Sequence, residues 1–179
     1  MLPALQQRFD VLEERRHSLL TRLRALDAGL VRYHPDPRAW SMLQVVQHLI
    51  LVEHLIMKAM TSDNRPKVRR RWWHRIGASI VAFVFRHGFR VPVPTRRVMP
   101  QGEVPLDDSS RRWDALRGQL RAFLESSTVE SAGNLGLHHP ISGPLDIASS
   151  LDFIQTHFDH HLRQVARIEA SAARGARSH

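Results

Sequence analysis

The stretch SMLQVVQHLILVEHLIMKAM (residues 41–60) decides the fold, because its apolar residues cover two sides of a single helix. Stepping about 100° per residue, one apolar group has His48 at its edge and a second group lies on the opposite side. The first group is Val45, Leu49, Val52, Ile56 and Ala59, and the second is Leu43, Val46, Ile50 and Met57. A helix that is apolar on two sides needs a cover on both. We therefore expect it inside a bundle, covered on its second side by the following segment or by a partner subunit.

Three further segments have the spacing of amphipathic helices, in which apolar residues recur every three or four positions. They cover residues 5–30, about 107–124 and about 146–172. Four long helices with almost no alternating strand pattern predict an all-α protein, a four-helix bundle with a long insertion between its second and third helices. One domain is expected over residues 1–172, followed by a flexible tail over 173–179.

Prolines and polar residues indicate the helix ends and the connections. Ser41 is expected to cap the second helix, and Asp107 or Ser109 the third, because their side-chain oxygens can accept from the free amides of a first turn. The insertion, residues 61–105, is expected to be irregular, with a short helix over 76–85. Its apolar run is far below the roughly 20 residues that cross a bilayer. Residues 127–145 are expected to form a loop.

The composition limits the chemistry that the chain can perform. It has no cysteine, which excludes disulfides, thiolate metal sites and cysteine nucleophiles, so a transition metal would need histidine or carboxylate ligands. The 12 histidines are therefore the main chemical resource. The formal net charge is +9, but the arginines are spread along the chain, which disfavours nucleic acid as a partner. No signal-peptide pattern opens the sequence, and a cytoplasmic protein is expected.

The stretch HFDHHLRQV (residues 157–165) places three histidines within five positions of the last helix. On its helical wheel His161 lies on the apolar axis and His157 at the apolar edge, whereas His160 lies well round toward solvent. Residues four apart stack on one helix face, so His157 and His161 can reach one ion, as in helical His-x-x-x-His pairs. His48, in the middle of the second helix, is the best candidate for a third ligand.

A simpler interpretation is that these are satisfied or solvent-facing histidines, because a histidine pair four residues apart is a weak signal for a metal. Burying three imidazoles without partners costs about 1–3 kcal/mol each, which favours a shared ion. Spacing alone leaves both interpretations open. The remaining histidines considered are interpreted as surface or loop residues: His54, His74, His87, His138 and His139.

Two segments carry a set of short motifs in a fixed order. WSMLQVVQHLILVEHL (residues 40–55) has Trp-Ser, His-Leu and a following Glu, and HHPISGPLDIASSLDFIQTHFDHHLRQ (residues 138–164) has His-Pro, Gly-Pro-Leu, His-x-x-x-His and a final Gln. Together these motifs resemble those of the DinB/YfiT-like superfamily. The motifs are short, but the resemblance covers nearly the whole chain in order. It implies a four-helix bundle that binds one divalent metal ion through three histidines, which map onto His48, His157 and His161.

The resemblance also implies an ion and a class of reaction. The ion in this superfamily is commonly nickel, zinc or iron, and characterised relatives include transferases that join low-molecular-weight thiols to electrophiles. Homodimers are common among them. Three neutral imidazoles leave the ion its positive charge and open positions, where a water or a thiol loses a proton near neutral pH. Because the chain has no cysteine, the thiol would have to be a small molecule.

Three residues near the expected ligands have more than one interpretation. Gln164, one turn past His161, is either a hydrogen-bonding partner of the site or a helix-end residue. Glu53 lies about 140° from His48 on the wheel and is not assigned a catalytic role. Trp40 is interpreted as core packing or a helix staple rather than a substrate contact.

The sequence thus predicts a metal-dependent enzyme, a small-molecule transferase or hydrolase, with residues 61–105 walling its pocket. A second class is peripheral membrane binding, because RRRWWHRIGASIVAFVF (residues 69–85) joins arginines and tryptophans to an apolar helix. Covering the second apolar side of the helix over 41–60 is the preferred role for this segment. Nucleic-acid binding through the same arginines is a third class and the least favoured.

Overall fold

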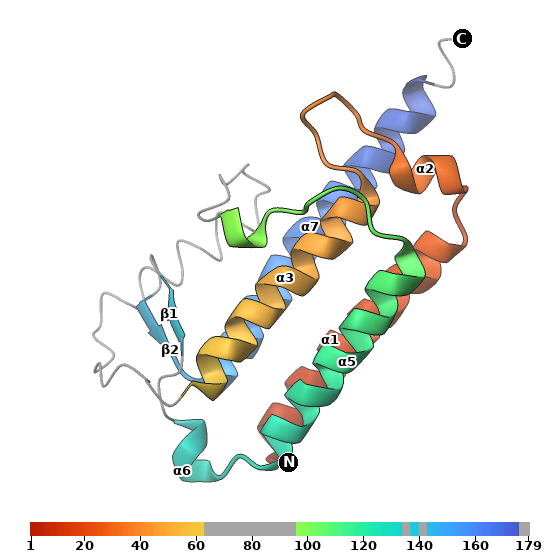
Figure 1. The fold of residues 1–179 in the computed structure, drawn as a ribbon. Helices are drawn as coiled ribbons and strands as arrows, with labels where there is room; N and C mark the ends of the chain where they lie inside the picture. Colours follow the sequence, from red (N-terminus) through yellow and green to blue (C-terminus); the bar gives the residue numbers. More distant parts are fainter. Residues whose placement is uncertain (63–95, 134–136, 140–142, 176–179) are drawn as a thin grey trace.

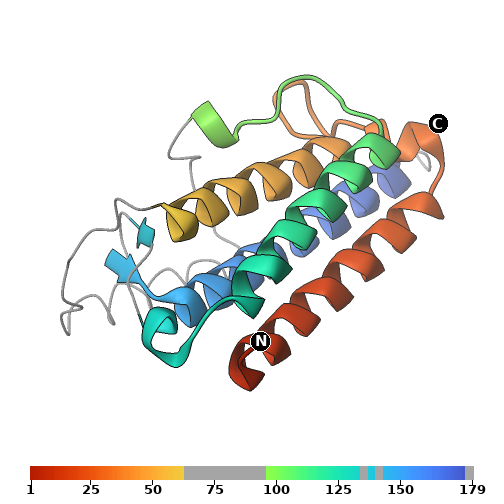
Figure 2. The same cartoon turned by 60° about the horizontal axis from the view of Figure 1, so that its bottom comes forward.

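The computed structural model describes residues 1–62, 96–133, 137–139 and 143–175. Its long helices are α1 (Pro3–Arg24), α3 (Met42–Thr61), α5 (Leu106–Glu125) and α7 (Ile147–Gly175). The shorter elements are α2 (Ala28–Arg32), the 3₁₀ helix η1 (Arg96–Val98), α6 (Val129–Ala132) and an antiparallel hairpin of β1 (Leu137–His139) and β2 (Gly143–Leu145). The long helices lie side by side (Figure 1 and Figure 2), and the expected all-α class is confirmed.

The directions of the long helices explain why one connection has to be long. α1 and α3 each pack against both α5 and α7. The ion pairs Arg8–Asp152 and Arg22–Glu169 show that α1 and α7 run in the same direction. α3 and α5 run together in the opposite direction (Figure 1). Two parallel neighbours cannot be joined by a tight turn, so residues 62–105 have to return the chain from the end of α3 to the start of α5.

α3 begins at the residue that the sequence predicts. Ser41 Oγ accepts a hydrogen bond from the backbone N–H of Gln44 at 3.3 Å, and Gln44 Oε1 accepts from the backbone N–H of Ser41 at 3.2 Å. This reciprocal capping box satisfies two amide groups that a helix end would otherwise leave free. It fixes the start of the helix that carries His48.

Both apolar sides of α3 are buried in its first half, whereas Ile50 and Met57, further along the second side, are only partly buried. Leu43 and Val46 on one side are as deeply buried as Val45 and Leu49 on the other. Besides α5 and α7, the helix contacts α2, η1 and β1. Among the described residues α3 is the one helix long and apolar enough to cross a membrane, and half of its apolar window is buried inside the protein. The short helix expected over residues 76–85 lies outside the described residues.

Two predicted helix ends differ from the structure. The apolar stripe over residues 5–30 predicts one helix, but α1 ends at Arg24 and α2 starts after Asp27. The Asp27 side chain accepts from the backbone N–H of Gly29 at 2.7 Å and thereby caps a new helix. α5 starts at Leu106, directly after Pro105, and neither predicted residue caps it, because Asp107 and Ser109 already lie inside its first turn.

The predicted loop over residues 127–145 contains α6 and the hairpin. Thr128 caps α6 in a capping box with Ser131. This local hydrogen-bond pattern starts a short helix where only a loop is expected. Each strand has three residues, too few for an alternating pattern to stand out. Residues 173–175, which are expected in the flexible tail, are helical, since α7 continues through Ala172 to Gly175.

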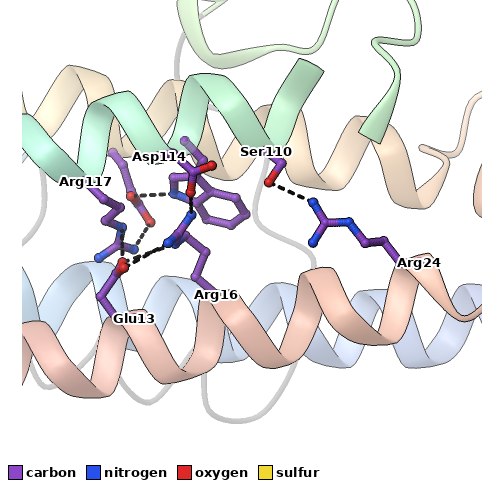
Figure 3. A network of polar contacts seen from close by, with 8 residues as sticks. Glu13, Arg16, Arg24, Ser110, Asp114 and Arg117 are labelled. Atoms are coloured by element: carbon purple, nitrogen blue, oxygen red, sulfur yellow. Dashed lines mark hydrogen bonds and ion pairs between the residues drawn. The ribbon is translucent and has the colours of Figure 1, made fainter. Parts of the chain in front are cut away.

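A buried ionic network joins α1, α3 and α5 (Figure 3). Arg117 is only 2% exposed; its Nη2 donates to Glu53 Oε1 at 2.7 Å, and its Nε lies 3.4 Å from Glu13 Oε1. The indole N–H of Trp113 donates to the other Glu53 oxygen at 2.9 Å. Arg16 extends the network by pairing with Glu13. The pairing offsets part of the cost of burying a carboxylate and a guanidinium, although Nε and Nη1 of Arg117 have no hydrogen-bond partner among the described residues.

Candidate metal site

Three histidines from two helices meet inside the bundle. His48 comes from the middle of α3, and His157 and His161 lie one turn apart on α7. The three residues are 4%, 8% and 6% exposed, respectively. The Nε2 atom of His157 lies 3.2 Å from Nε2 of His48 and 3.1 Å from Nε2 of His161. All three rings offer a nitrogen within 4.8 Å of the other two, the one such group found in the described part of the chain.

A backbone carbonyl fixes the orientation of His48. Its Nδ1 lies 2.7 Å from the carbonyl oxygen of Val98, in η1. A carbonyl oxygen can only accept a hydrogen bond, so Nδ1 carries the ring proton and donates it. In a neutral imidazole the other nitrogen then has no proton. His48 therefore points a free lone pair of Nε2 toward His157.

A side-chain amide fixes His161 in the same way. Its Nδ1 lies 2.8 Å from Oε1 of Gln164, one turn further along α7. The amide oxygen accepts, so the proton of His161 is on Nδ1 and the lone pair of Nε2 points inward. Gln164 thus lies beside the histidine cluster and holds one of its rings.

The two fixed rings create a conflict that a cation would remove. The lone pairs of His48 and His161 both approach Nε2 of His157, which can carry at most one proton and donate it toward one neighbour. At least one of the two close contacts therefore brings two acceptors together in a buried place. Unsatisfied buried acceptors are costly. An ion shared by the three nitrogens would satisfy every lone pair at once.

The spacing suits a transition metal. Bonds from zinc to imidazole nitrogen are about 2.0–2.1 Å long, and two such bonds meeting at about 90–110° place their nitrogens about 2.9–3.4 Å apart. The separations of 3.1 and 3.2 Å lie within that range. Imidazole is a suitable ligand for zinc, nickel and iron alike. Three protein ligands also leave coordination positions for water or a substrate.

Burial keeps the rings in their metal-binding form. Desolvation, with a smaller contribution from the neighbouring His48, lowers the pKa of His161 to about 3. Desolvation also lowers the pKa of His48, against the opposing effect of its hydrogen bond to Val98. Neutral imidazole is the form that coordinates a metal. These two rings are therefore ready to bind an ion at neutral pH without first losing a proton.

Aromatic rings flank the cluster. The Trp40 ring centroid lies 4.9 Å from that of His48 and 6.4 Å from that of His161, and Trp40 also packs against the core. This agrees with the core-packing interpretation and places the indole at the site as well. Phe153 stacks on His157 at 6.0 Å. The rings limit the freedom of the imidazoles and remove water from their sides.

The prediction that His160 faces solvent is wrong. The residue is 7% exposed, and its ring meets that of His161 edge-on at 5.1 Å. A helical wheel places a side chain by the apolar residues of its own helix, and it gives no account of an imidazole that is buried against another imidazole. His160 therefore adds a fourth buried histidine next to the three converging ones.

The other residues singled out from the sequence lie apart from the cluster or cannot be placed beside it. Glu53 belongs to the ionic network with Arg117 and Trp113; burial raises its pKa, and these two donors counteract that effect. His54 is exposed on α3, as expected. His138 and His139 form part of β1 in the predicted loop region, and His74 and His87 lie outside the described residues.

Fold and site together define a helical-bundle protein with a buried cluster of three histidines suited to one metal ion. The sequence profile of the DinB superfamily matches residues 11–165, which is most of the chain. The protein therefore belongs to the DinB superfamily. None of the curated proteins compared with the chain matches it.

Proposed function

We propose that the protein is a divalent-metal-dependent enzyme in which His48, His157 and His161 hold one ion. The observation that carries the proposal is the approach of two fixed lone pairs to the ring nitrogen of His157, at 3.1 and 3.2 Å in a buried site. Membership of the DinB superfamily supports it, because the resemblance implies the same three ligands. Nickel, zinc and iron are the ions we propose for the site.

The ion would supply a Lewis acid that lowers the pKa of a bound water or thiol. The chain's own part is to hold three neutral rings in place. The carbonyl of Val98 and the amide oxygen of Gln164 orient two of them. Trp40 and Phe153 pack against the rings and keep water away from their sides. Neutral ligands leave the full positive charge of the ion available to its open positions.

For the reaction, we propose transfer of a low-molecular-weight thiol to an electrophilic small molecule, with hydrolysis of a small molecule as the alternative. In the transfer, the thiol gives its proton to solvent and its sulfur forms the new bond to an electrophilic carbon. The bond between that carbon and its leaving group breaks, and the leaving group departs with the bonding electrons and takes up a proton. The absence of cysteine supports a thiol that enters as a co-substrate rather than one supplied by the chain. We further propose a cytoplasmic homodimer.

The competing proposal is a peripheral membrane or interaction protein in which the metal site is structural. It rests on the arginines, tryptophans and apolar residues of segment 69–85, which lies outside the described residues. Flotation with anionic liposomes at low salt separates the two, because only this alternative requires binding. Nucleic-acid binding stays the least favoured proposal, and a gel shift with steep salt dependence would be its signature.

Elemental analysis of protein purified without chelators tests the metal site. We expect about one divalent ion per chain in the wild type and in His54→Ala, and none in His157→Ala. His54 is a fair control because it removes an exposed imidazole from α3 and leaves the buried cluster intact. A metal-free wild type, or equal metal content in all three proteins, would contradict the proposal.

A further inference from the structure

We propose that residues 96–102 help to set the affinity of the metal site for its ion. The docking of this segment on α3 and the binding of the ion are linked equilibria, so that each strengthens the other. This inference rests on the proposed metal site and goes beyond it, since it assigns a role to the end of the long connection between α3 and α5. That role is to determine which nitrogen of the His48 ring is free to bind the ion.

Three residues of α3 hold the segment by its carbonyl groups. His48 Nδ1 donates to Val98 O at 2.7 Å. Gln47 Nε2 and Gln44 Nε2 donate to the carbonyl oxygen of Gly102, at 3.3 and 3.4 Å. Gln47 is itself buried. One side of α3 therefore anchors both ends of the stretch from Val98 to Gly102.

The segment is also held by an apolar contact and shaped by a turn. Val98 is 3% exposed and belongs to the same buried cluster as Val52 and Ile56 of α3. Gly102 has a φ of 68°, a left-handed conformation in which a residue with a side chain is strained. This turn lies at the residue whose carbonyl oxygen accepts from Gln44 and Gln47, so the backbone of the segment has a defined conformation where it contacts α3.

The hydrogen bond to Val98 decides the tautomer of His48. While the bond is made, the proton is on Nδ1 and Nε2 is free to bind. When the segment leaves α3, the proton can move to Nε2, where it blocks coordination. In the other direction, an ion on Nε2 draws electron density from the ring and makes Nδ1–H a stronger donor to Val98. By linkage, the two effects have the same free energy.

The linkage makes the long connection a point of control. A ligand or partner that detaches Arg96–Gly102 from α3 would lower the affinity for the ion without touching any of its three ligands. A ligand that holds the segment down would raise that affinity. The affinity of the site for an ion would thus depend on the connection between α3 and α5, which the parallel arrangement of these two helices requires in any case.

Zinc binding to Val98→Ala and Val31→Ala tests the linkage. Both variants remove two methyl groups from a buried valine, and Val31 lies on α2, outside the docked segment. At neutral pH, with a competing chromophoric chelator, we expect Val98→Ala to bind zinc at least about tenfold more weakly than the wild type. We expect Val31→Ala to stay within about twofold of the wild type, because it does not loosen the partner of His48.

Hydrogen exchange gives a readout independent of affinity. Saturating zinc should slow amide exchange in residues 96–102 of the wild type. If Val98→Ala does not fold, Gln47→Met replaces it, with exposed Gln7→Met as its control. Equal zinc affinities of the test and control variants, or exchange in 96–102 that zinc leaves unchanged, would overturn the linkage while the metal site stands. A wild type that binds none of zinc, nickel and iron would overturn both.

Discussion

At the scale of single residues, the site is organised by hydrogen bonds on the far side of its rings. A neutral histidine presents a lone pair only on the nitrogen that lacks the proton. Val98 and Gln164 hold the Nδ1 protons of His48 and His161, and thereby direct both lone pairs to one place. The arrangement of the metal-binding nitrogens thus depends on two hydrogen-bond acceptors that are not themselves ligands.

Gln164 provides a direct test of this dependence. Replacing Gln164 by Ala should weaken zinc binding by about tenfold or more, because His161 loses the acceptor that keeps its proton on Nδ1. Gln164→Glu should bind more tightly than Gln164→Ala, since a carboxylate oxygen also accepts. Gln155→Ala, on the same helix, is the control and should bind like the wild type. Affinities can be measured by chelator competition, and equal affinities for all four proteins would contradict the role of Gln164.

The lowered pKa of His161 predicts a pH dependence of stability in the metal-free protein. This ring protonates near pH 3 in the folded state and near pH 6.5 in the unfolded chain. Between these values the unfolded chain binds more protons, so the free energy of unfolding falls as the pH falls. The slope from this residue alone is about 1.4 kcal/mol per pH unit.

Urea denaturation of the metal-free wild type, His161→Gln and His54→Gln from about pH 7 down to about pH 4 checks this dependence. The variant His161→Gln lacks the titrating ring and should show a shallower fall in stability than the wild type. His54→Gln removes an exposed histidine and should leave the slope unchanged. Parallel curves for all three proteins would show that His161 does not titrate as described.

At the scale of helices, two kinds of ion pair hold the bundle. The α1–α7 pairs of Arg8, Arg15 and Arg22 with acidic residues of α7 are partly exposed, and each is expected to contribute less than about 1 kcal/mol. The pair of Arg117 and Glu53 between α3 and α5 is almost fully buried. Removing one member of a buried pair leaves the other charge without compensation.

The contrast predicts very different costs for the same substitution. Arg117→Met should lower the free energy of unfolding by about 3–5 kcal/mol, because Glu53 stays buried without its partner. Arg15→Met should lower it by less than about 1 kcal/mol. The double variant Glu53→Met, Arg117→Met should recover part of the loss. Chemical denaturation measures all three, and a cost for Arg117→Met as small as that for Arg15→Met would contradict the importance of the buried pair.

The sequence predicts the long helices better than their ends. Residues 41–60 have a dominant periodic pattern and a cap at Ser41, and α3 follows both. The stripe over residues 5–30 stays periodic across the break at Ala25, so only the local capping by Asp27 reveals a second helix. Periodicity reports burial over many residues, whereas helix ends depend on one or two hydrogen bonds.

At the scale of the whole molecule, the topology links the core to the site. α3 and α5 run in parallel, so the chain has to make a long return. Near the end of this connection, the carbonyl oxygen of Val98 accepts a hydrogen bond from His48. The same connection that completes the bundle therefore also supports one of the three rings.

Ion binding should be visible in the stability of the entire protein. Zinc at about 100 times its dissociation constant should raise the free energy of unfolding by about 2.7 kcal/mol, because only the folded chain brings the three nitrogens together. The gain should vanish in His157→Ala and persist in His54→Ala. Thermal unfolding with and without zinc measures it. A similar gain in His157→Ala would place the stabilising ion elsewhere.

The sequence predicts the three converging histidines, but it does not predict all of the residues that contact them. Helical wheels select His157 and His161, and the apolar helix points to His48, because burial and four-residue spacing are local properties. The burial of His160 does not follow from the apolar stripe of its own helix. The acceptor for His48 is a backbone carbonyl about fifty positions away, which any residue type could supply, so no pattern in the sequence marks it.

The most direct test of the shared ion is anomalous diffraction from crystals of the zinc-loaded protein, recorded at the zinc absorption edge. We predict one strong peak inside the bundle, about 2.0–2.1 Å from Nε2 of each of His48, His157 and His161. A zinc ion bound elsewhere, with these three rings turned away from one another, would contradict the account.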